Sequence, residues 1–266
     1  MAVFLDIDGT LIMGAEGPFD DDVAAIERAR RQGHRIFFNT GRSLAVIPPY
    51  LMAAPWVDGI IAGGGSHVLL REGDRLDTIY HVQVDEDALC AIGAFYLAHP
   101  KWCIFEGETE VYAIPARGTP EYPMKIEESY HIVEGAGDFH GRYAGAVVTK
   151  ITIDGAVTRE EAALFAGRFN TFWLGGYSEA VISGESKARG MEIALTALGI
   201  PPARSVAVGD SANDLEMIRR AGIGIAMGNA CDELKRAAAW ITAPCGRGGV
   251  ARALEKWVTG DQDSDR

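Results

Sequence analysis

The sequence lacks the features that mark membrane, secreted or zinc-binding proteins. Its 4 cysteines include no Cys-x-x-Cys pair, so neither a zinc site nor a disulfide framework is indicated. No apolar run approaches the roughly 20 residues of a membrane helix. The first apolar run ends at Asp6, too early for a signal peptide. We therefore expect a cytoplasmic protein whose cysteines are reduced.

Basic side chains are also scarce. The chain has 25 lysine and arginine residues against 37 aspartate and glutamate residues, a formal net charge of −12. Nucleic acids and anionic membranes bind basic faces, so we expect neither as a partner. An anionic small substrate is compatible with this charge, because a divalent cation and a few local cations decide the field inside a site. We expect a monomer or a homodimer.

The most informative feature that is present is a pair of carboxylates directly after a short apolar run. The strand-like residues 2–6 end in Asp6, and Asp8, Gly9 and Thr10 follow. A carboxylate at the end of a buried strand is a rigidly aimed nucleophile, and Asp8, past the strand end, is placed to give or take a proton. For this short motif alone, an acidic turn or a helix cap is the competing interpretation.

Strand-like and helix-like segments alternate at both ends of the chain but not between them. The 266 residues leave room for two domains, at about 150 residues per domain. Residues 1–79 and 183–259 follow the βαβ order of a doubly wound, Rossmann-like α/β core with a parallel sheet, including a helix at 43–51 that two prolines break. Residues 80–182 mix helices with hairpin-like strands, which predicts an inserted α+β cap domain. The polar tail at 260–266 is expected to be disordered.

Two more carboxylates follow a second apolar run, at 206–208. Asp210 comes shortly after that run, and Asp214 lies at the start of the next predicted helix. Because the carboxyl ends of neighbouring parallel strands share one edge, these two are expected to converge with Asp6 and Asp8. Four acidic groups repel one another unless a hard cation lies among them. Mg²⁺ is the natural occupant, because it prefers oxygen ligands and binds substrate phosphate.

Two further segments suit a phosphate group. Thr40-Gly41-Arg42 follows a predicted strand, where a hydroxyl and free amides at a helix start can hold phosphate oxygens. Lys187 lies near the start of the helix that returns the chain to the core, where its point charge can offset a carboxylate nucleophile and a phosphoryl group. Alone, Thr40 would be a helix cap and Lys187 a solvated lysine; their order between the two aspartate clusters favours the phosphate site.

Together these residues resemble the ordered motifs of a known family. The haloacid dehalogenase superfamily, specifically its Cof-type branch, has four motifs similar to Asp6-x-Asp8-Gly9-Thr10, Thr40-Gly41-Arg42, Lys187 and Gly209-Asp210-x-x-Asn213-Asp214. The resemblance covers nearly the whole chain except the polar tail, and the combination is specific although each piece is weak. It implies a phosphatase with a large cap inserted between the second and third motifs.

The resemblance also implies roles for the matching residues. Asp6 would be the nucleophile that forms an aspartyl-phosphate, and Asp8 would protonate the leaving group and then activate water. Thr40 and Lys187 would bind phosphate, with Gly41 and Arg42 beside Thr40. Hydrolysis would thereby be split into two easier displacements.

A metal site is implied by the same resemblance. Asp6, the Asp8 carbonyl and Asp210 would ligate Mg²⁺. Asp214 would support the metal shell, and Asn213 would orient the phosphate or the lysine.

The cap and the turn after the third strand carry less information. Relatives often have Asn-Gly-Ala where this chain has Gly63-Gly64-Gly65-Ser66, so a substrate contact by that asparagine is not implied; the glycines fit a flexible entry to the cap or a plain tight turn. In the cap, Lys150 lies where relatives commonly carry lysine and is the first candidate for substrate contact. A solvated cation is the competing interpretation for it and for the other candidates, which are Arg117, Lys125, His131, His140 and Arg142.

These patterns predict a Mg²⁺-dependent phosphatase of small phosphorylated metabolites, either sugar phosphates or phosphoglycerate-type compounds. A phosphomutase that uses the same aspartyl-phosphate is the alternative, and a requirement for a bisphosphate activator would reveal it. A non-catalytic protein that binds phosphorylated metabolites is disfavoured, because every matching carboxylate and Lys187 is present.

Overall fold

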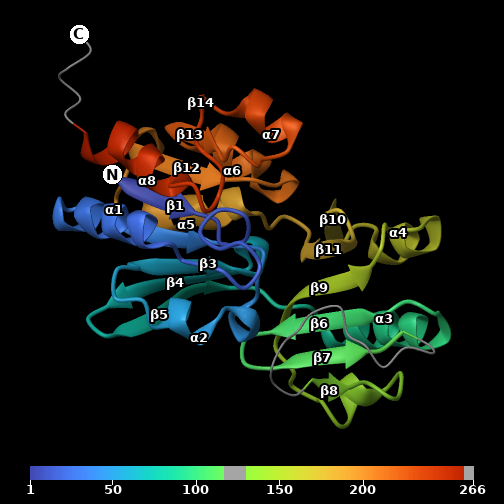
Figure 1. The fold of residues 1–266 in the computed structure, drawn as a ribbon. Helices are drawn as coiled ribbons and strands as arrows, with labels where there is room; N and C mark the ends of the chain where they lie inside the picture. Colours follow the sequence, from blue (N-terminus) through green and yellow to red (C-terminus); the bar gives the residue numbers. More distant parts are fainter. Residues whose placement is uncertain (117–129, 261–266) are drawn as a thin grey trace. The chain divides into compact units, whose positions relative to one another are not determined.

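The computed structural model describes residues 1–116 and 130–260. The chain divides into two compact units (Figure 1). The core unit consists of Met1–Gly41, Tyr50–Tyr80 and Ser186–Arg266, and the cap unit of Arg42–Pro49 and His81–Glu185. Segment 42–49, which the sequence had placed in the core, thus groups with the cap. The predicted tail lies, apart from residue 260, outside the described residues.

The core unit is built on an 8-stranded sheet in the order β14-β13-β12-β1-β2-β3-β4-β5. The pairs from β14 to β3 are parallel, and β4 pairs with β3 antiparallel. This order places β1 between β2 and β12, so strands from the two ends of the chain are neighbours in one sheet. Figure 1 draws β1 in blue and β12 in orange. The strands are β1 (Ala2–Leu5), β2 (Arg35–Asn39), β3 (Gly59–Ala62), β4 (His67–Glu72), β5 (Arg75–His81), β12 (Ser205–Gly209), β13 (Ile223–Ala226) and β14 (Trp240–Ile241).

Helices of the core unit pack in two groups, α1 with α8 and α5 with α6 and α7. In α1 three aspartates lie in the first turn and three arginines in the last turn, which complements the helix dipole. Its buried face carries Ala25, Ile26 and Ala29 at helical spacing. The helices are α1 (Asp20–Arg31), α2 (Pro49–Met52), α5 (Lys187–Ala197), α6 (Leu215–Arg220), α7 (Asp232–Ala237) and α8 (Gly249–Leu254), followed by a π-helix at Glu255–Thr259.

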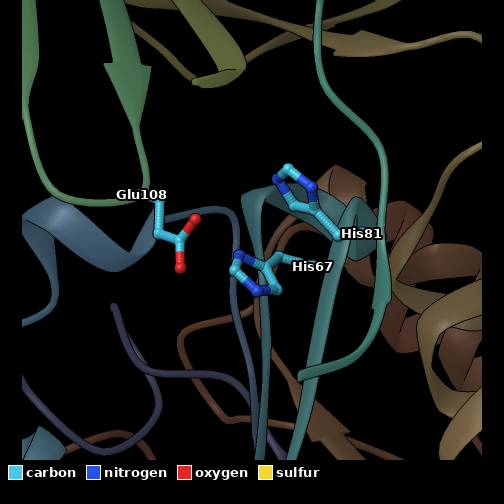
Figure 2. A group of neighbouring side chains, drawn as sticks. All are labelled: His67, His81 and Glu108. Carbon is cyan, nitrogen blue, oxygen red and sulfur yellow. The ribbon is translucent and has the colours of Figure 1, made fainter. Parts of the chain in front are cut away.

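Two segments of the core sequence differ from expectation. The segment expected as a helix broken by two prolines is broken there, but its first part is a 3₁₀ turn, Leu44–Val46, and its second part is the short α2, which begins at Pro49. Proline disfavours the helical conformation of the residue before it, so one helix cannot continue across Pro48 and Pro49. The β4–β5 pair was not predicted. His67, drawn in Figure 2, lies at the start of β4. It is buried, and its Nε2 lies 2.9 Å from Thr78 Oγ1 on β5.

The cap unit has a 6-stranded sheet in the order β10-β11-β9-β6-β7-β8, antiparallel except between β7 and β8. Its helix α4 begins with a capping box in which Thr158 and Glu161 exchange side-chain and backbone hydrogen bonds. The elements are α3 (Glu86–Ala98), β6 (Cys103–Gly107), β7 (Val111–Ile114), β8 (His131–Ile132), β9 (Val148–Asp154), α4 (Arg159–Phe165), β10 (Phe169–Trp173) and β11 (Tyr177–Ile182).

Successive residues of β6 enter two different apolar clusters of the cap, as the two-residue period of a strand requires. Phe105 belongs to the larger cluster, which also contains Tyr96 of α3 and Phe165 of α4. Ile104 belongs to a smaller cluster that includes Val46. Segment 42–49 therefore joins the cap unit because Val46 is buried against β6.

The α/β class predicted from the sequence is confirmed, with a parallel-sheet core and an inserted α+β cap. Among residues 1–116 and 130–260, none of the helices combines the length and the apolar character that a bilayer span requires.

Candidate active site

Asp6 lies one residue beyond β1, whose residues are all buried. Its backbone N–H donates to Val208 O at 3.0 Å, so the pairing of β1 with β12 continues as far as the carboxylate. The Asp6 side chain is buried, whereas Asp8 is exposed. The turn that follows Asp8 requires a glycine at position 9. Gly9 has a φ of +75°, and a Cβ there would come within 2.1 Å of Asp210 Oδ2. The chain thus presents one buried and one accessible carboxylate.

Lys187 is the first residue of α5, which Ser186 caps by accepting a hydrogen bond from Arg189 N. Its Nζ donates to Asp6 Oδ1 at 2.7 Å and to Asp214 Oδ1 at 2.5 Å, and the residue is 2% exposed. Burial alone would lower the pKa of this ammonium group, but the Asp214 and Asp6 carboxylates raise the pKa above its usual value. Lys187 therefore stays protonated between the two carboxylates.

Asp210 and Asp214 follow β12 and have different hydrogen-bond partners. Asp214 Oδ2 accepts from the N–H groups of Asp210 (2.9 Å) and Ser211 (3.0 Å), so with Lys187 on Oδ1 both oxygens of Asp214 have protein donors. Asp210 Oδ2 accepts from Asn229 Nδ2 at 3.2 Å. Asp210 Oδ1 is buried, with no hydrogen-bond partner in the described part of the chain.

The carboxylates at this edge perturb one another's titration. Burial raises the pKa of Asp6 well above its ordinary value; Lys187 opposes this shift, and Asp214 and Asp210 add to it. Burial and then the Asp214 charge raise the pKa of Asp210 to about 7. A cation placed among these groups would favour their charged forms.

Three carboxylates at this edge fit a divalent cation. One oxygen from each of Asp6, Asp210 and Asp214 lies within 4.8 Å of the others, and an all-oxygen donor set suits a hard cation. Asp210 Oδ1, which has no hydrogen-bond partner among residues 1–116 and 130–260, is the atom that a ligand role would satisfy. Asp214, whose two oxygens already accept protein hydrogen bonds, suits a supporting position.

Thr40 and the glycine-rich segment after β3 (63–66) pack tightly beside the start of α5. Thr40 is 1% exposed, and its carbonyl accepts from Gly64 N at 3.0 Å. Gly65 has a φ of +108°, and a Cβ there would come within 2.1 Å of Ser186 O. The glycines thus allow close backbone approach between the Thr40 turn and the helix that carries Lys187, which favours the tight-turn interpretation. Gly41 follows Thr40 in the same unit.

Asn229 is the residue of this site that the sequence reasoning missed. Its Nδ2 donates to Gly9 O (2.9 Å) and to Asp210 Oδ2, and its Oδ1 accepts from Cys245 N (2.8 Å). It lies shortly after β13, the neighbour of β12. The rule that located Asp210, a polar side chain after an apolar strand, also points to Asn229. Asn213, which was predicted, accepts from Ser211 Oγ at 2.8 Å.

Arg42 and Lys150 belong to the cap unit and have partners within it. Arg42 Nη1 donates to Val46 O at 2.7 Å. Lys150 is 3% exposed, and its Nζ lies 2.7 Å from Glu179 Oε1 and 3.1 Å from Glu106 Oε1. Burial alone would lower the pKa of Lys150, but the two glutamates raise the pKa above its usual value. The expected role of both residues in substrate binding stays a prediction.

Of the other described cap candidates, His140 and Arg142 are exposed and His131 is half-buried, and each has a cap carboxylate within ion-pair distance. Arg117 and Lys125 lie outside the described residues. The pairs are His131 with Glu110 (3.5 Å), His140 with Asp87 (3.2 Å) and Arg142 with Glu134 (2.9 Å).

The cap unit has a polar hollow of about 350 Å³ beside the turn between β6 and β7. Glu108, drawn in Figure 2, and Glu110 supply carboxylates to its lining. Tyr112 OH donates to Glu110 Oε2 at 2.6 Å, and the Tyr112 and His131 rings lie 5.4 Å apart. The hollow therefore combines hydrogen-bond acceptors with aromatic surface.

Comparison with known proteins gives a consistent result. Residues 3–254 match the family described as haloacid dehalogenase-like hydrolase. A putative phosphatase, YkrA, of Bacillus subtilis (strain 168) is 27% identical over 265 residues, covering 96% of each chain. The 5-amino-6-(5-phospho-D-ribitylamino)uracil phosphatase YitU of the same organism is 26% identical over 271 residues, covering 97% of each. The solved structure of the subclass IIB sugar phosphatase BT4131 is 26% identical, has a TM-score of 0.80, and is matched over 96% of this chain and 98% of its own.

Proposed function

Because the chain belongs to the Cof-type haloacid dehalogenase-like hydrolases and is a phosphatase, we propose that it hydrolyses small phosphorylated metabolites with Mg²⁺ at the carboxylate edge of the core unit. The observation that carries the proposal is the convergence of Asp6, Asp210 and Asp214 with the Lys187 ammonium group after β1 and β12. Phosphatases of this superfamily generally use a divalent metal. An anionic substrate can approach these carboxylates only when cations offset their negative charge.

In the first step Asp6 attacks phosphorus, and the bond from phosphorus to the leaving oxygen breaks. Asp8 gives its proton to that oxygen, so the alcohol leaves neutral and the phosphoryl group stays on Asp6 as an aspartyl-phosphate. Lys187 offsets charge on the nucleophile before the step and on the phosphoryl group after it. Positioning and charge neutralisation supply most of the rate in phosphoryl transfer.

In the second step water displaces Asp6 from phosphorus. Asp8, now a carboxylate, takes a proton from that water, so inorganic phosphate leaves and both aspartates return to their starting states. Thr40 and the Gly41 amide would hold phosphate oxygens, and Asn213 would orient the phosphate or the lysine. Bound Mg²⁺ supplies charge neutralisation and would be held by Asp6, the Asp8 carbonyl and Asp210, with Asp214 in support.

Selection among substrates is proposed to come from the cap unit, with Arg42 at its start. The polar hollow beside β6 and β7 and the paired Lys150 are the candidates for contact with the leaving group. Similarity to a sugar phosphatase and to a phosphatase of a ribityl phosphate supports a hydroxyl-rich leaving group. Sugar phosphates are therefore the first substrate class proposed, and phosphoglycerate-type compounds the second. The 4 free cysteines support a reducing, cytoplasmic setting.

The test is a screen of the full chain with Mg²⁺ against a panel of phosphorylated sugars, polyols and acids, with released inorganic phosphate as the readout. We expect several phosphates to be hydrolysed, all by the same site, so Asp6→Asn should be inactive throughout the panel. Phosphate release that survives in Asp6→Asn would contradict the mechanism. Isomerised phosphate esters formed only with a bisphosphate activator would instead indicate a phosphomutase.

A further inference from the structure

We propose that the core unit carries a second anion-binding site, at the amino-terminal ends of β2 and β3, which takes a small polyanion with phosphate groups. A hollow of about 580 Å³ lies there. Its charged lining is a cluster of guanidinium groups around a buried carboxylate, and its wall is an indole ring. The lining residues used below are Glu27, Arg30, Arg31, Arg35, Trp56 and Asp58.

Asp58 holds two of these arginines in place. Its Oδ1 accepts from Arg35 Nη1 at 3.2 Å and from Arg30 Nε at 3.4 Å, while Oδ2 accepts from Ile36 N at 2.9 Å. The Asp58 side chain is 5% exposed, whereas those of Arg30 and Arg35 are 40% and 53% exposed. The buried carboxylate thus anchors two guanidinium groups that face solvent.

The arginine pair keeps capacity for a second anion. Each guanidinium group presents five N–H donors, and Asp58 accepts one from Arg30 and one from Arg35. A phosphate group, whose oxygens match the planar fork of arginine, can therefore bind without displacing Asp58.

The net charge of the residues that line the hollow is opposite in sign to that of the whole chain. Arg31 adds a third guanidinium group and lies 3.6 Å from Glu27, and both of these side chains are largely exposed. Three guanidinium groups therefore stand against two carboxylates in this hollow, in a chain whose formal net charge is −12. Such a local reversal of sign concentrates anions at one place on the surface.

The wall beside the arginines is apolar and well packed. Trp56 is 7% exposed and packs edge-on against Phe38 of β2, with ring centroids 5.5 Å apart. Arg71 holds the same loop by donating to Val57 O at 2.6 Å and to Ala54 O at 3.4 Å. An apolar wall excludes water on one side, which strengthens charge pairing at the arginines.

The site is separate from the catalytic edge. Arg35 begins β2 and Thr40 follows its other end, so the hollow and the phosphate turn lie at opposite ends of one strand. The 5 residues of β2 span about 17 Å at roughly 3.3 Å per residue. An anion in the hollow therefore cannot be a substrate in reaction.

The experiment titrates the full chain, in the Mg²⁺ buffer used for turnover, with tripolyphosphate while tryptophan fluorescence is recorded. We expect a saturable change that disappears in Trp56→Phe and weakens with added salt. Binding in the Arg30→Gln/Arg35→Gln double variant should be at least about tenfold weaker, the size expected when charge-assisted hydrogen bonds are lost. Binding at the catalytic edge is followed separately, as inhibition of aryl phosphate hydrolysis, which these substitutions should leave unchanged.

Arg31→Gln leaves the Asp58 contacts intact and should weaken binding several-fold, so the test does not depend on the fold of the double variant. Arg220→Gln is the matched control, because it also removes a guanidinium group from an ion pair, with Glu192 at 2.7 Å, but lies outside the hollow. Unchanged affinity in Arg31→Gln, a fluorescence change that persists in Trp56→Phe, or no binding at millimolar tripolyphosphate would each overturn the proposal.

Discussion

Lys187 Nζ lies 2.7 Å from Asp6 Oδ1, although 181 residues separate the two in the chain. The contact is fixed from both sides. Asp6 continues the pairing of β1 with β12, and Asn39 at the end of β2 donates from Nδ2 to Lys187 O at 2.9 Å. A cation is thereby held against the proposed nucleophile before any substrate arrives, which is the preorganisation that phosphoryl transfer requires.

Replacing Asp6 with asparagine should abolish phosphate release and leave the chain folded. The amide is nearly isosteric but cannot attack phosphorus, and Lys187 keeps its bond to Asp214. Activity would be measured as released phosphate and folding by circular dichroism. Asp20→Asn, the same substitution at an exposed position of α1, should keep full activity, and substantial turnover by Asp6→Asn would contradict the assignment.

Asp8→Asn should impair proton transfer, a contribution commonly worth about 10²–10⁴-fold. The loss should be smallest for substrates whose leaving groups need no proton, such as an activated aryl phosphate, and largest for alkyl phosphates. The measurement is kcat/KM across a series of leaving groups. An equal loss for every member of the series would argue against a role in protonation.

Removal of divalent metal with a chelator should stop turnover, and Mg²⁺ should restore it. Because Asp210 Oδ1 has no partner among the described residues, Asp210→Ala should raise the Mg²⁺ concentration required by at least the roughly 10–100-fold seen when partners of metal ligands are changed. Asp214→Ala should instead lower the melting temperature, since it leaves Lys187 and two backbone N–H groups without this acceptor. Metal titration and thermal unfolding of both variants would show the reverse order if the two roles are exchanged.

Lys150→Met separates a structural from a substrate-binding role. Loss of this cation leaves Glu106 and Glu179 buried together, and breaking a buried ion pair from one side typically costs about 3–5 kcal/mol in the free energy of unfolding. Arg168→Gln removes an exposed cap ion pair with Asp85 and should cost only about 0–1 kcal/mol. If Lys150 instead contacts substrate, stability should change little, and KM should rise more for a sugar phosphate than for an aryl phosphate.

Asp22 should make stability depend on pH. Its Oδ1 accepts from Ala251 N at 2.8 Å, which joins α1 to α8, and burial raises the pKa of Asp22 above the unfolded value of 3.8. The folded state therefore takes up the proton first as the pH falls. The contribution of Asp22 to stability is full below pH 3.8 and is lost as the pH rises through the folded pKa.

Asp22→Asn removes this titration. As the pH is lowered from neutral, the free energy of unfolding of the wild-type chain should therefore rise relative to that of the variant. Urea unfolding at several pH values would measure the difference. A wild-type advantage that shrinks on acidification would contradict the burial argument.

The convergence of side chains at the proposed catalytic edge was largely predictable, because these residues obey a local rule. In a parallel sheet the residues just after each strand meet at one edge, so Asp6, Thr40 and Asp210 could be assigned together from apolar runs alone. The same rule covers Asn229, which was overlooked because a single amide after a short strand carries no charge pattern.

Local propensity was a weaker guide elsewhere. The break at the two prolines in 43–51 was predicted, but the part before them is a 3₁₀ turn and not an α-helix, and Val46 in that turn is buried in the smaller cap cluster. The β4–β5 pair was missed because much of both strands is only partly buried, which blurs the alternation of apolar and polar residues. The turn at Gly73, with a φ of +61°, was the available signal.

The α/β class, the insertion and the carboxylates at the strand ends follow from the amino-acid sequence, because strand period and chain order are local properties and sheet geometry brings the strand ends together. The surroundings of each charge depend on the three-dimensional packing instead. The burial of Lys150 between two glutamates and the convergence of Arg30 and Arg35 on Asp58 both join residues far apart in the chain. Which distant side chain fills a buried space depends on packing across elements, and no single segment encodes that.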